Sequence, residues 1–275
     1  MKPIPFTKMS GTGNDFIIID NRKHLVEDET LTEFVKGICR RKMSVGADGL
    51  ILIESSDKAD FRWRFFNSDG SLAEMCGNGA RCAARFAYLN GIAGDTLSFE
   101  TEAGIISGQV KGRGAKVKIP DPEDLRLDFR VDLDKGSLTV NSLNTGVPHV
   151  VILQDAIDDV DVVGLGRQLR YHDAFAPAGT NVNFVCRQKT GQLAIRTYER
   201  GVEDETLACG TGAIASALVA SCKTDGTSPV SLQTRSGESL TIYFRASNHR
   251  FTDVYLEGDA RLIYTGELGE DAWTS

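Results

Sequence analysis

Two short stretches of this chain place a cysteine before closely spaced glycines, a pattern that can support chemistry. "EMCGNGARC" puts Cys76 before Gly-Asn-Gly, and "ACGTGA" puts Cys209 before Gly-Thr-Gly. A helix that begins at such a turn leaves its first backbone N–H groups without intrahelical acceptors, and its dipole adds about half a positive charge there. That end attracts a carboxylate, and glycines let the ligand approach the backbone. A thiol at a helix N-terminus has a pKa below about 8.5 and can act as a base.

The recurrence of the pattern suggests one particular reaction. The two motifs lie about half a chain length apart, which favours a duplicated unit. Two such turns would hold the carboxylate of one α-amino acid with a sulfur on each face of its α-carbon. One thiolate then removes the α-proton while the opposite thiol donates another, so the stereocentre inverts. The helix N–H groups would stabilise the enediolate-like carbanion, and no cofactor is required.

Other chemistries fit the sequence less well. No Cys-x-x-Cys pair occurs and the four histidines (24, 149, 172 and 249) are scattered, so we expect no metal. "SGTGND" at 10–15 precedes a strand pattern and lacks the third glycine of a dinucleotide loop, which predicts a ligand-facing loop. The remaining cysteines (39, 82, 186 and 222) are expected to pack in the interior. Two other classes stay open: a thiol redox protein that uses Cys76 and Cys209 as a disulfide couple, and an amino-acid-binding module without activity.

The composition of the chain indicates which classes of binding partner to expect. The chain has 275 residues, 41% hydrophobic and 25% charged, which is typical of a soluble globular protein. Its net charge of −7 disfavours nucleic acid. No apolar run is long enough for a signal peptide or a membrane span, and six cysteines are too few for a disulfide framework. We expect a cytoplasmic protein with a small amino-acid substrate. The oligomeric state stays open, with a homodimer as one option.

Strand and helix patterns alternate along the chain. Apolar or β-branched runs bounded by turn residues predict strands at 16–20, 49–54, 61–67, 97–101, 115–120, 149–153, 181–186, 193–199, 239–244 and 253–258. Helical spacing predicts helices at 31–42, 78–91 and 210–222. Two prolines among acids in "IPDPEDL" favour a domain crossing near residue 122.

Six motifs in order resemble those of the diaminopimelate epimerase family, which uses no cofactor. They cover nearly the whole chain and read "KMSGTGNDFIIID", "VGADGL", "FFNSDGSLAEMCGNGARC", "TGVPHVV", "GTNVNFV" and "YERGVEDETLACGTGA". The resemblance implies an α/β (α+β) fold of two pseudo-symmetric domains, each a mixed sheet or barrel around a central helix, with the active site in the cleft between them. It implies domains at 1–122 and 123–264, with 265–275 returning to the first. The implied activity interconverts L,L- and meso-diaminopimelate, in lysine and peptidoglycan-precursor biosynthesis.

The resemblance also assigns roles to individual residues. Cys76 would act on the L,L isomer and Cys209 on the meso isomer. Glu199 would bind the reacting ammonium and, with His149, support proton transfer. The backbone groups that would bind the reacting carboxylate are those of Gly77, Asn78, Gly210 and Thr211. The side chains that would bind the substrate are Asn14, Asn67, Asn181 and Arg200. This polar set argues against a related isomerase of the same fold that acts on proline-like or aromatic acids.

Two positions depart from the family pattern. Val147 stands where the family commonly has an asparagine that helps bind the distal end of the substrate. A missing hydrogen bond of this kind costs about 0.5–1.5 kcal/mol. We therefore expect relaxed discrimination, including racemisation of glutamate. Asp259 replaces a usual proline in a turn, and we expect no effect on the chemistry.

Overall fold

The computed structural model describes residues 3–73, 75–224, 226–248 and 250–274. It divides into two compact units, Met1–Lys118 with Glu257–Ser275, and Ile119–Leu256. The chain therefore crosses just before both prolines of "IPDPEDL", slightly earlier than the position near 122 expected from the sequence. It returns at Glu257, also earlier than expected, because the strand that begins at Arg250 runs through the crossing to Asp259.

The first unit contains two α-helices and one continuous set of paired strands. Its helices are α1 (Leu31–Cys39) and α2 (Gly77–Leu89), and its strands are β1 (Ile4–Gly11), β2 (Asn14–Asp20), β3 (Gly49–Glu54), β4 (Phe61–Asn67), β5 (Leu72–Ala73), β6 (Thr96–Thr101), β7 (Gly104–Lys111), β8 (Gly114–Lys118) and β18 (Arg261–Leu268). β18, β1, β2, β3 and β4 are neighbours in that order, and only β2–β3 is parallel among them. β4 then pairs with β5 and, in parallel, with β6, which continues into β7 and β8.

The two parallel strands β2 and β3 are buried on both faces. Ile17 and Leu50 belong to the apolar cluster that includes Val35 and Ile38 of α1. The alternate residue Ile51 points to the other side, where its Cδ1 lies 3.4 Å from the position that a Cβ on Gly79 of α2 would occupy. Burial on both faces explains why "FIIID" and "GLILIE" are continuous apolar runs rather than alternating ones.

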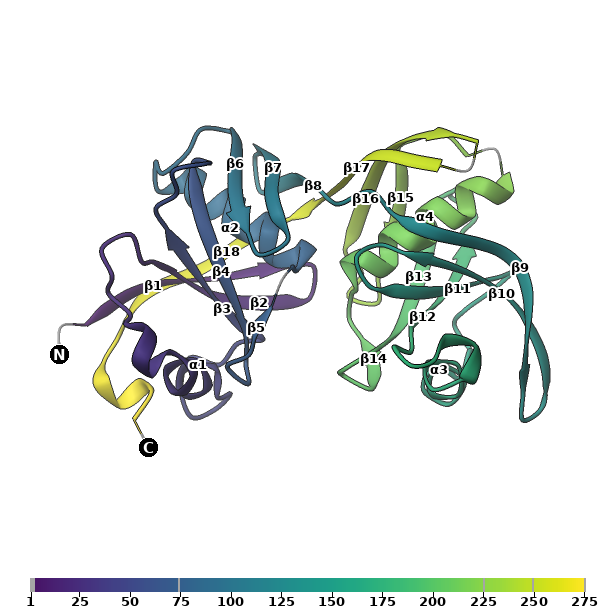
Figure 1. Ribbon diagram of the computed structural model, residues 1–275, viewed down its shortest axis with the longest axis horizontal. Coiled ribbons are helices and arrows are strands. Elements are labelled where there is room, and N and C mark those ends of the chain that lie inside the picture. Colours follow the sequence, from purple (N-terminus) through teal and green to yellow (C-terminus); the bar gives the residue numbers. More distant parts are fainter. Residues whose placement is uncertain (1–2, 74, 225, 249, 275) are drawn as a thin grey trace. The chain divides into compact units, whose positions relative to one another are not determined.

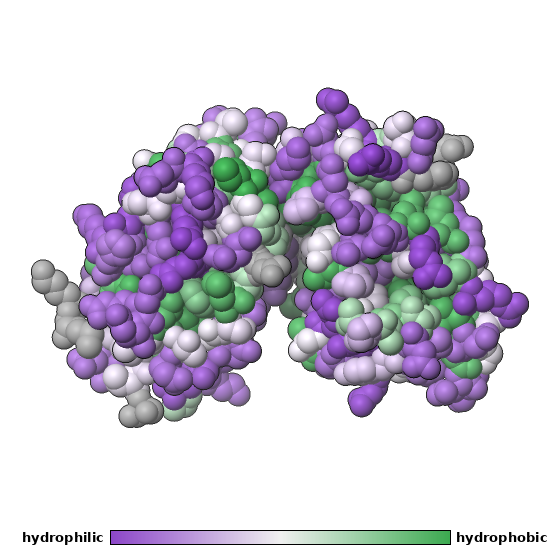
Figure 2. Space-filling view, in the orientation of Figure 1, coloured by the Kyte–Doolittle hydropathy of each residue, from purple (hydrophilic) through white to green (hydrophobic). Residues whose placement is uncertain are grey.

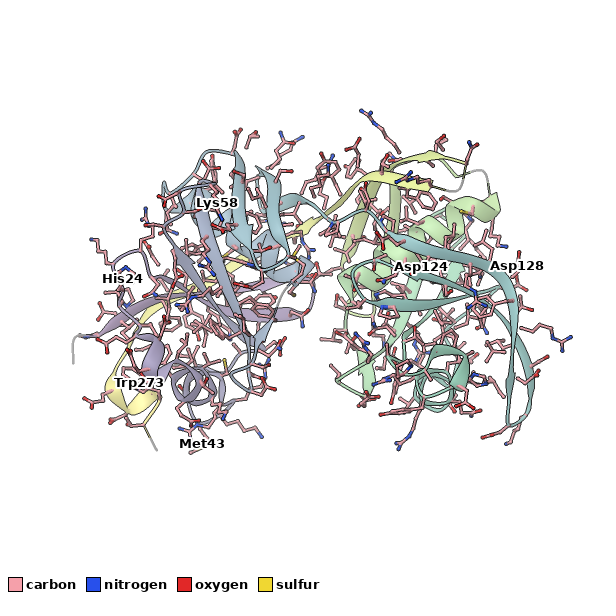
Figure 3. The ribbon with its side chains drawn as sticks, in the orientation of Figure 1. His24, Met43, Lys58, Asp124, Asp128 and Trp273 are labelled. Atoms are coloured by element: carbon pink, nitrogen blue, oxygen red, sulfur yellow. The ribbon has the colours of Figure 1, made fainter. Side chains whose placement is uncertain are left out.

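Helix α2 runs through the middle of the first unit, where β1, β2, β3, β7 and β8 all contact it (Figure 1). Its buried side chains are mostly small, as at Ala80, Ala83, Ala84 and Ala87. Small side chains let strands approach a helix from several sides without leaving voids. On the other side of the sheet, the ring of Trp273 packs edge-on against Phe34 of α1, with centroids 5.1 Å apart (Figure 3).

The second unit has its own helices and strands. Its helices are α3 (Val162–Arg170) and α4 (Gly210–Thr224), and its strands are β9 (Glu123–Leu133), β10 (Gly136–Asn144), β11 (Pro148–Gln154), β12 (Asn181–Arg187), β13 (Leu193–Glu199), β14 (Asp204–Thr206), β15 (Val230–Gln233), β16 (Ser239–Ser247) and β17 (Arg250–Asp259), the last of which ends in the first unit. Three short 3-10 turns are described, at Asp28–Thr30 and Glu270–Ala272 in the first unit and at Asp173–Phe175 in the second.

Hydrophilic residues cover much of the face shown in Figure 2.

The two units repeat the same order of strand pairing. β10–β11–β12–β13 pair in the same senses as β1–β2–β3–β4, including one parallel step at β11–β12. β13 then pairs with β14 and, in parallel, with β15, as β4 does with β5 and β6. In each unit a helix that contacts the first three strands of the series, α2 or α4, follows the short fifth strand. The predicted fold class is therefore confirmed, with each motif cysteine at the start of its unit's central helix.

Candidate active site

Cys76 caps the N-terminus of α2. Its backbone is extended (φ −147°, ψ 114°), and its Sγ accepts a hydrogen bond from the backbone N–H of Gly79 at 3.4 Å. A Cβ on Gly79 would lie 3.3 Å from the ring of Trp63, so glycine lets this first turn pack closely on the sheet. The sulfur thus lies beside the helix end whose N–H groups favour an anion. Glu74, at the start of the motif, lies outside the described residues.

A series of side-chain hydrogen bonds, each donated in the same direction, starts at Arg81 in the second turn of α2 and ends at Asp48. Arg81 is fully buried, and its guanidinium donates to Oδ1 of Asn78 at 2.8 Å, to Oγ1 of Thr12 at 2.8 Å and to the carbonyl of Gly77 at 3.2 Å. Nδ2 of Asn78 donates to Oδ1 of Asn14 at 2.6 Å. Nδ2 of Asn14 in turn donates to Asp48 at 3.0 Å. Because a guanidinium only donates and a carboxylate only accepts, both amide orientations are fixed.

Asp48 is itself held by a charged cluster. It accepts from the backbone N–H of Asp15 at 3.2 Å and from Arg41 at 2.8 Å, while Arg41 and Lys8 also bind the Asp15 carboxylate at 2.6 Å and 2.9 Å. Burial raises the pKa of Asp15, but the hydrogen bonds from Arg41 and Lys8 outweigh it and hold the pKa below the ordinary value of 3.8. The cluster therefore keeps Asp48 in place as the end of the amide chain.

Asn67 lies close to this cluster in the sheet but takes no part in the series of side-chain hydrogen bonds from Arg81 to Asp48. It is the exposed last residue of β4, opposite Gly49, and its Nδ2 donates to Oγ of Ser71 at 3.0 Å. The backbone N–H of the next residue, Ser68, donates to the carbonyl of Asp48 at 3.1 Å. Of the residues that the sequence assigned to the first unit, Asn14 and Asn78 are thus in direct contact through their side chains, whereas Asn67 ends β4, which β3 separates from the β2 strand of Asn14.

Cys209 has the corresponding position before α4. Its Sγ accepts from the backbone N–H of Gly212 at 3.4 Å and lies 3.5 Å from Oγ1 of Thr211. The carbonyl of Thr211 accepts from Oγ1 of Thr145 at 3.2 Å, which fixes the turn to the end of β10. The spacing of sulfur and N–H is the same in both units, Cys76 to Gly79 and Cys209 to Gly212. Each unit therefore offers one thiol at one helix end.

Three adjacent strand ends carry the other predicted residues of the second unit. His149 on β11 is paired with Asn181 on β12, and Oδ1 of Asn181 accepts from the backbone N–H of Arg200 at 2.9 Å. Arg200 follows Glu199, the last residue of β13, and its guanidinium donates to the carbonyl of Ala178 at 3.0 Å. Nδ2 of Asn181 donates to the carbonyl of Pro148 at 3.0 Å. The structure thus brings together His149, Asn181, Glu199 and Arg200.

His149 is buried, and its pKa is lowered to about 3. The larger cause is burial, and the smaller is the positive charge of Arg200. Its ring is therefore neutral at physiological pH. Nδ1 lies 3.2 Å from Nδ2 of Asn183, a fully buried residue on β12. A Cβ on Gly212 would lie 2.3 Å from Oδ1 of the same Asn183, so this amide also packs directly against the start of α4.

Comparison with known proteins shows the family of this chain. The family model for diaminopimelate epimerase matches residues 6–122 and 141–263. The chain belongs to the diaminopimelate epimerase family. It is 45% identical to the diaminopimelate epimerase of Aquifex aeolicus (strain VF5), over 97% of this chain and 98% of the relative. It is 46% identical to that of Hydrogenobaculum sp. (strain Y04AAS1), over 95% and 97%.

Solved structures share the fold at much lower identity. A phenazine biosynthesis protein of the PhzF family from Bacillus anthracis has a TM-score of 0.76 at 17% identity and covers 98% of this chain and 99% of its own. A probable proline racemase from Agrobacterium radiobacter K84 has a TM-score of 0.72 at 12% identity, over 97% and 93%. At these identities the likeness concerns the fold alone, and it agrees with the two-domain architecture of this family.

The four other cysteines differ from the two of the motifs. Burial raises the pKa of Cys39 and of Cys82 to about 12. Burial also raises the pKa values of Cys186 and Cys222. All four therefore stay protonated at neutral pH, which agrees with a packing role. Within the described residues, no group of three or more His, Cys, Asp or Glu side chains is placed to hold a metal ion, and no helix has both the length and the apolarity to span a membrane. His249 lies outside these residues.

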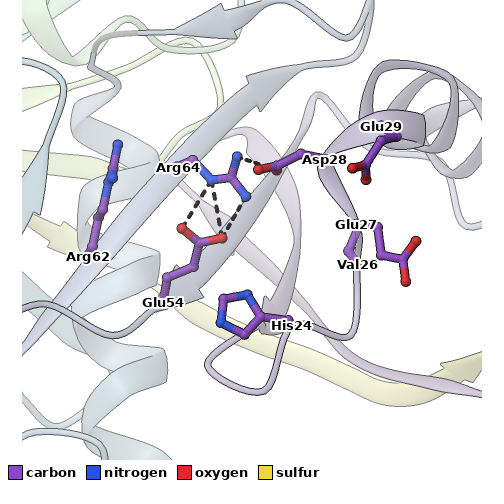
Figure 4. Close-up of a pocket in the computed structure, with 8 residues that line it drawn as sticks. All are labelled: His24, Val26, Glu27, Asp28, Glu29, Glu54, Arg62 and Arg64. Carbon is purple, nitrogen blue, oxygen red and sulfur yellow. Dashed lines mark hydrogen bonds and ion pairs between the residues drawn. The ribbon is translucent and has the colours of Figure 1, made fainter.

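A polar cavity of about 760 Å³ in the first unit is lined by none of the predicted site residues (Figure 4). One wall is Arg64, which forms a two-pronged ion pair with Glu54 at 2.6–3.1 Å and a further ion pair with Asp28 at 2.7 Å. These partners satisfy the guanidinium within the fold. The cavity therefore belongs to the surface ion pairs of β3 and β4 and not to the cysteine motifs.

Sequence reasoning missed the residues that hold the site side chains in place. Arg81, Asp48 and Asn183 were given no role, although "GNGARC", "VGADGL" and "NVNFV" contain them. One signal was available for Arg81, because an arginine three positions after Asn78 lies on the same face of the predicted helix. The contacts of Asp48 and Asn183 join distant segments and had no local signal.

Proposed function

We propose that this chain interconverts L,L- and meso-diaminopimelate without a cofactor, with Cys76 and Cys209 as the two proton carriers. One observation carries the proposal: each unit of a chain from this family holds a cysteine Sγ 3.4 Å from a backbone N–H in the first turn of its central helix. A single base would not need a second copy of that arrangement. Inversion needs a proton removed from one face of the α-carbon and delivered to the other.

The chemistry follows from the two helix ends. The substrate carboxylate binds the N–H groups of the first turns, at Gly77 and Asn78 and at Gly210 and Thr211. One cysteine, as thiolate, takes the α-proton and becomes a thiol, and the electron pair passes into the carboxylate. The N–H groups stabilise the resulting enediolate. The other cysteine gives its S–H proton to the opposite face and becomes the thiolate, so the enzyme is ready for the reverse reaction.

The polar side chains would select and orient the substrate. Glu199 is proposed to bind the reacting ammonium, with His149 nearby as a neutral group. Asn14 and Asn78 would act as one unit, since their amides bond each other at 2.6 Å. Asn67, Asn181 and Arg200 are proposed to bind the rest of the amino acid. The backbone contacts of Asn181 and Arg200 would hold both at the strand ends before the substrate arrives.

A conversion assay tests this function. Purified, reduced protein is incubated with L,L-diaminopimelate without pyridoxal phosphate, and the isomers are separated on a chiral column. We expect growth of the meso isomer toward equilibrium and none with Cys76→Ala. No conversion, together with inversion of another amino acid, would move the function to a relative with a different substrate. Disulfide exchange by the oxidised protein without any epimerisation would favour the redox alternative.

We infer a homodimer from an apolar surface on β18. Three consecutive residues there, Leu262, Ile263 and Tyr264, are 42%, 52% and 43% exposed. Adjacent exposed apolar residues on a strand are a frequent site of association. Sedimentation should show a dimer that Ile263→Asp converts to monomers, and a monomeric native chain would contradict it.

The structure records six thiols and no disulfide among the described residues, which supports a proposal of cytoplasmic location.

A further inference from the structure

The buried amide of Asn183 has an orientation that its neighbours fix. Its Oδ1 accepts from Oγ1 of Thr197 at 2.9 Å, and its Nδ2 lies 2.9 Å from the carbonyl oxygen of Val150. A carbonyl oxygen only accepts hydrogen bonds, so the amide nitrogen must be the atom on that side. The same nitrogen lies 3.2 Å from Nδ1 of His149. An amide nitrogen has two hydrogens, and these two acceptors use both of them.

The contact with Asn183 determines where His149 carries its proton. Because the amide nitrogen can only donate, Nδ1 of His149 must accept, and a neutral imidazole then has its hydrogen on Nε2. The ring is neutral at physiological pH because burial holds its pKa far below the usual value. Nε2 is buried as well, and within the residues that the structure describes it has no hydrogen-bond partner. A buried N–H without an acceptor is unusual in folded proteins and points to a ligand.

We propose that Asn183 is a positioning residue that holds His149 as the neutral Nε2–H tautomer, so that the ring donates a hydrogen bond to an anionic oxygen or sulfur of the reacting complex and does not act as a base. This inference rests on the proposed function, which supplies the anion. In this tautomer neither ring nitrogen has a lone pair available to take a proton from a cysteine, since Nδ1 is occupied by Asn183. His149 therefore lowers the energy of an anion through its N–H and leaves proton transfer to the thiols.

The tautomer can be measured independently of activity. Protein labelled with ¹⁵N in histidine is examined by long-range ¹H–¹⁵N correlation NMR near pH 7.5, and His149→Gln assigns the signals of His149 by their loss. We expect an Nε2-protonated neutral ring in the native protein. An Nδ1-protonated ring or an imidazolium in the native protein would overturn the proposal. This measurement needs no variant of Asn183, so it decides the tautomer even if such variants fold poorly.

Two variants then test whether Asn183 sets the tautomer. Asn183→Asp replaces the donating nitrogen by an oxygen, so the ring must carry a hydrogen on Nδ1. Thr197→Val removes the donor to Oδ1 without adding charge, and we expect the Nε2–H tautomer to persist, because the Val150 carbonyl still holds the amide nitrogen on the side of His149. With diaminopimelate we expect Asn183→Asp to lower kcat at least about tenfold with a smaller change in KM, because a donor to the anion is lost. Retention of the Nε2–H ring in Asn183→Asp would contradict the proposal.

Asn141 supplies the matched control. It is also a buried asparagine of the second unit, on β10, but its side chain bonds only the backbone, at the N–H of Asp128 (3.2 Å) and the carbonyl of Val151 (3.2 Å). Asn141→Asp should lower stability as any buried carboxylate does, yet leave the His149 signals unchanged. If Asn141→Asp shifts the tautomer equally, the effect is structural and the proposal fails. If the native ring is Nε2–H but no epimerisation occurs, the proposed function fails and the tautomer assignment stands.

Discussion

The side-chain amide of Asn78 donates a 2.6 Å hydrogen bond to Oδ1 of Asn14, 64 positions earlier in the chain. This bond joins the first turn of α2 to the beginning of β2, directly after the Thr12–Gly13 turn within "SGTGND". Two residues that the sequence assigned separately to substrate binding are therefore one structural element. Its ends are a buried cation, Arg81, and a carboxylate, Asp48.

Asp48→Asn should weaken substrate binding more than it slows the chemistry. The aspartate uses one carboxylate oxygen to accept from Asn14 and the other to accept from Arg41. The new asparagine has only one side-chain oxygen, so one of these hydrogen bonds is lost. A loss of about 0.5–1.5 kcal/mol corresponds to a rise in KM of roughly twofold to twelvefold with a smaller change in kcat. Steady-state kinetics with L,L-diaminopimelate measure both. The control is Asp20→Asn, at the other end of β2, where the carboxylate binds Arg22. An equal rise in KM for both variants would contradict a specific role of Asp48.

Acid should weaken the fold in part through Asp15. Its pKa is lowered in the folded protein, so its contribution to stability is present above about pH 3.8 and is lost as the pH falls through the folded value. Asp15→Asn should therefore be less stable than the native chain by about 1–3 kcal/mol at pH 7, with the difference shrinking below pH 4. Urea unfolding at several pH values measures this. Asp57→Asn, an exposed residue between β3 and β4, serves as the control. A difference that grows on acidification would refute the assignment.

Val147 tests substrate discrimination. It is half-buried between β10 and β11, two residues before His149. We expect the native enzyme to exchange the α-proton of L-glutamate faster than Cys76→Ala does. Val147→Asn should lower KM for diaminopimelate by roughly twofold to twelvefold, because one hydrogen bond worth about 0.5–1.5 kcal/mol is restored. It should also reduce the ratio of glutamate to diaminopimelate turnover. Glutamate exchange no faster than in Cys76→Ala would show that Val147 does not relax specificity.

The cysteines should differ in reactivity. At pH 8 the thiols of Cys39 and Cys82 stay protonated, since burial raises the pKa of each to about 12. Only the thiolate reacts readily with iodoacetamide. Cys76 is half-buried at the N-terminus of its helix, and we expect its alkylation to parallel the loss of activity, as followed by mass spectrometry. Alkylation of Cys82 at the same rate would show that the start of α2 opens, and would contradict the description of Cys82 as a packing residue.

The strands with strong patterns were predictable. β3, β4 and β13 begin and end where their apolar runs do, because burial fixes both the residues and the register. Helix α1 ends at Cys39, earlier than the predicted residue 42, since Arg40 is extended and Lys42 has a positive φ of 69°. The two motif cysteines were found from glycine spacing alone, since a helix start is a local property.

Helix α3 and the positioning residues were not predictable in this way. α3 contains Gly164 and Gly166, which disfavour a helix locally. The structure explains Gly166, because a Cβ there would lie 2.4 Å from Cβ of Tyr198. Packing against β13 thus overrides propensity. The role of Asn183 depends in the same way on a tertiary contact, to a histidine 34 positions away.

The most direct test of the two-cysteine account is the fate of deuterium during turnover in D₂O. L,L-diaminopimelate is incubated with reduced enzyme, and the reaction is stopped early for mass spectrometry and NMR of both isomers. The account predicts deuterium at the inverted α-carbon of the meso product, with the recovered L,L isomer still carrying its proton. It also predicts no inversion by Cys76→Ala or Cys209→Ala. Deuterium entering both isomers equally fast in the native enzyme, or inversion by either variant at the native rate, would contradict it.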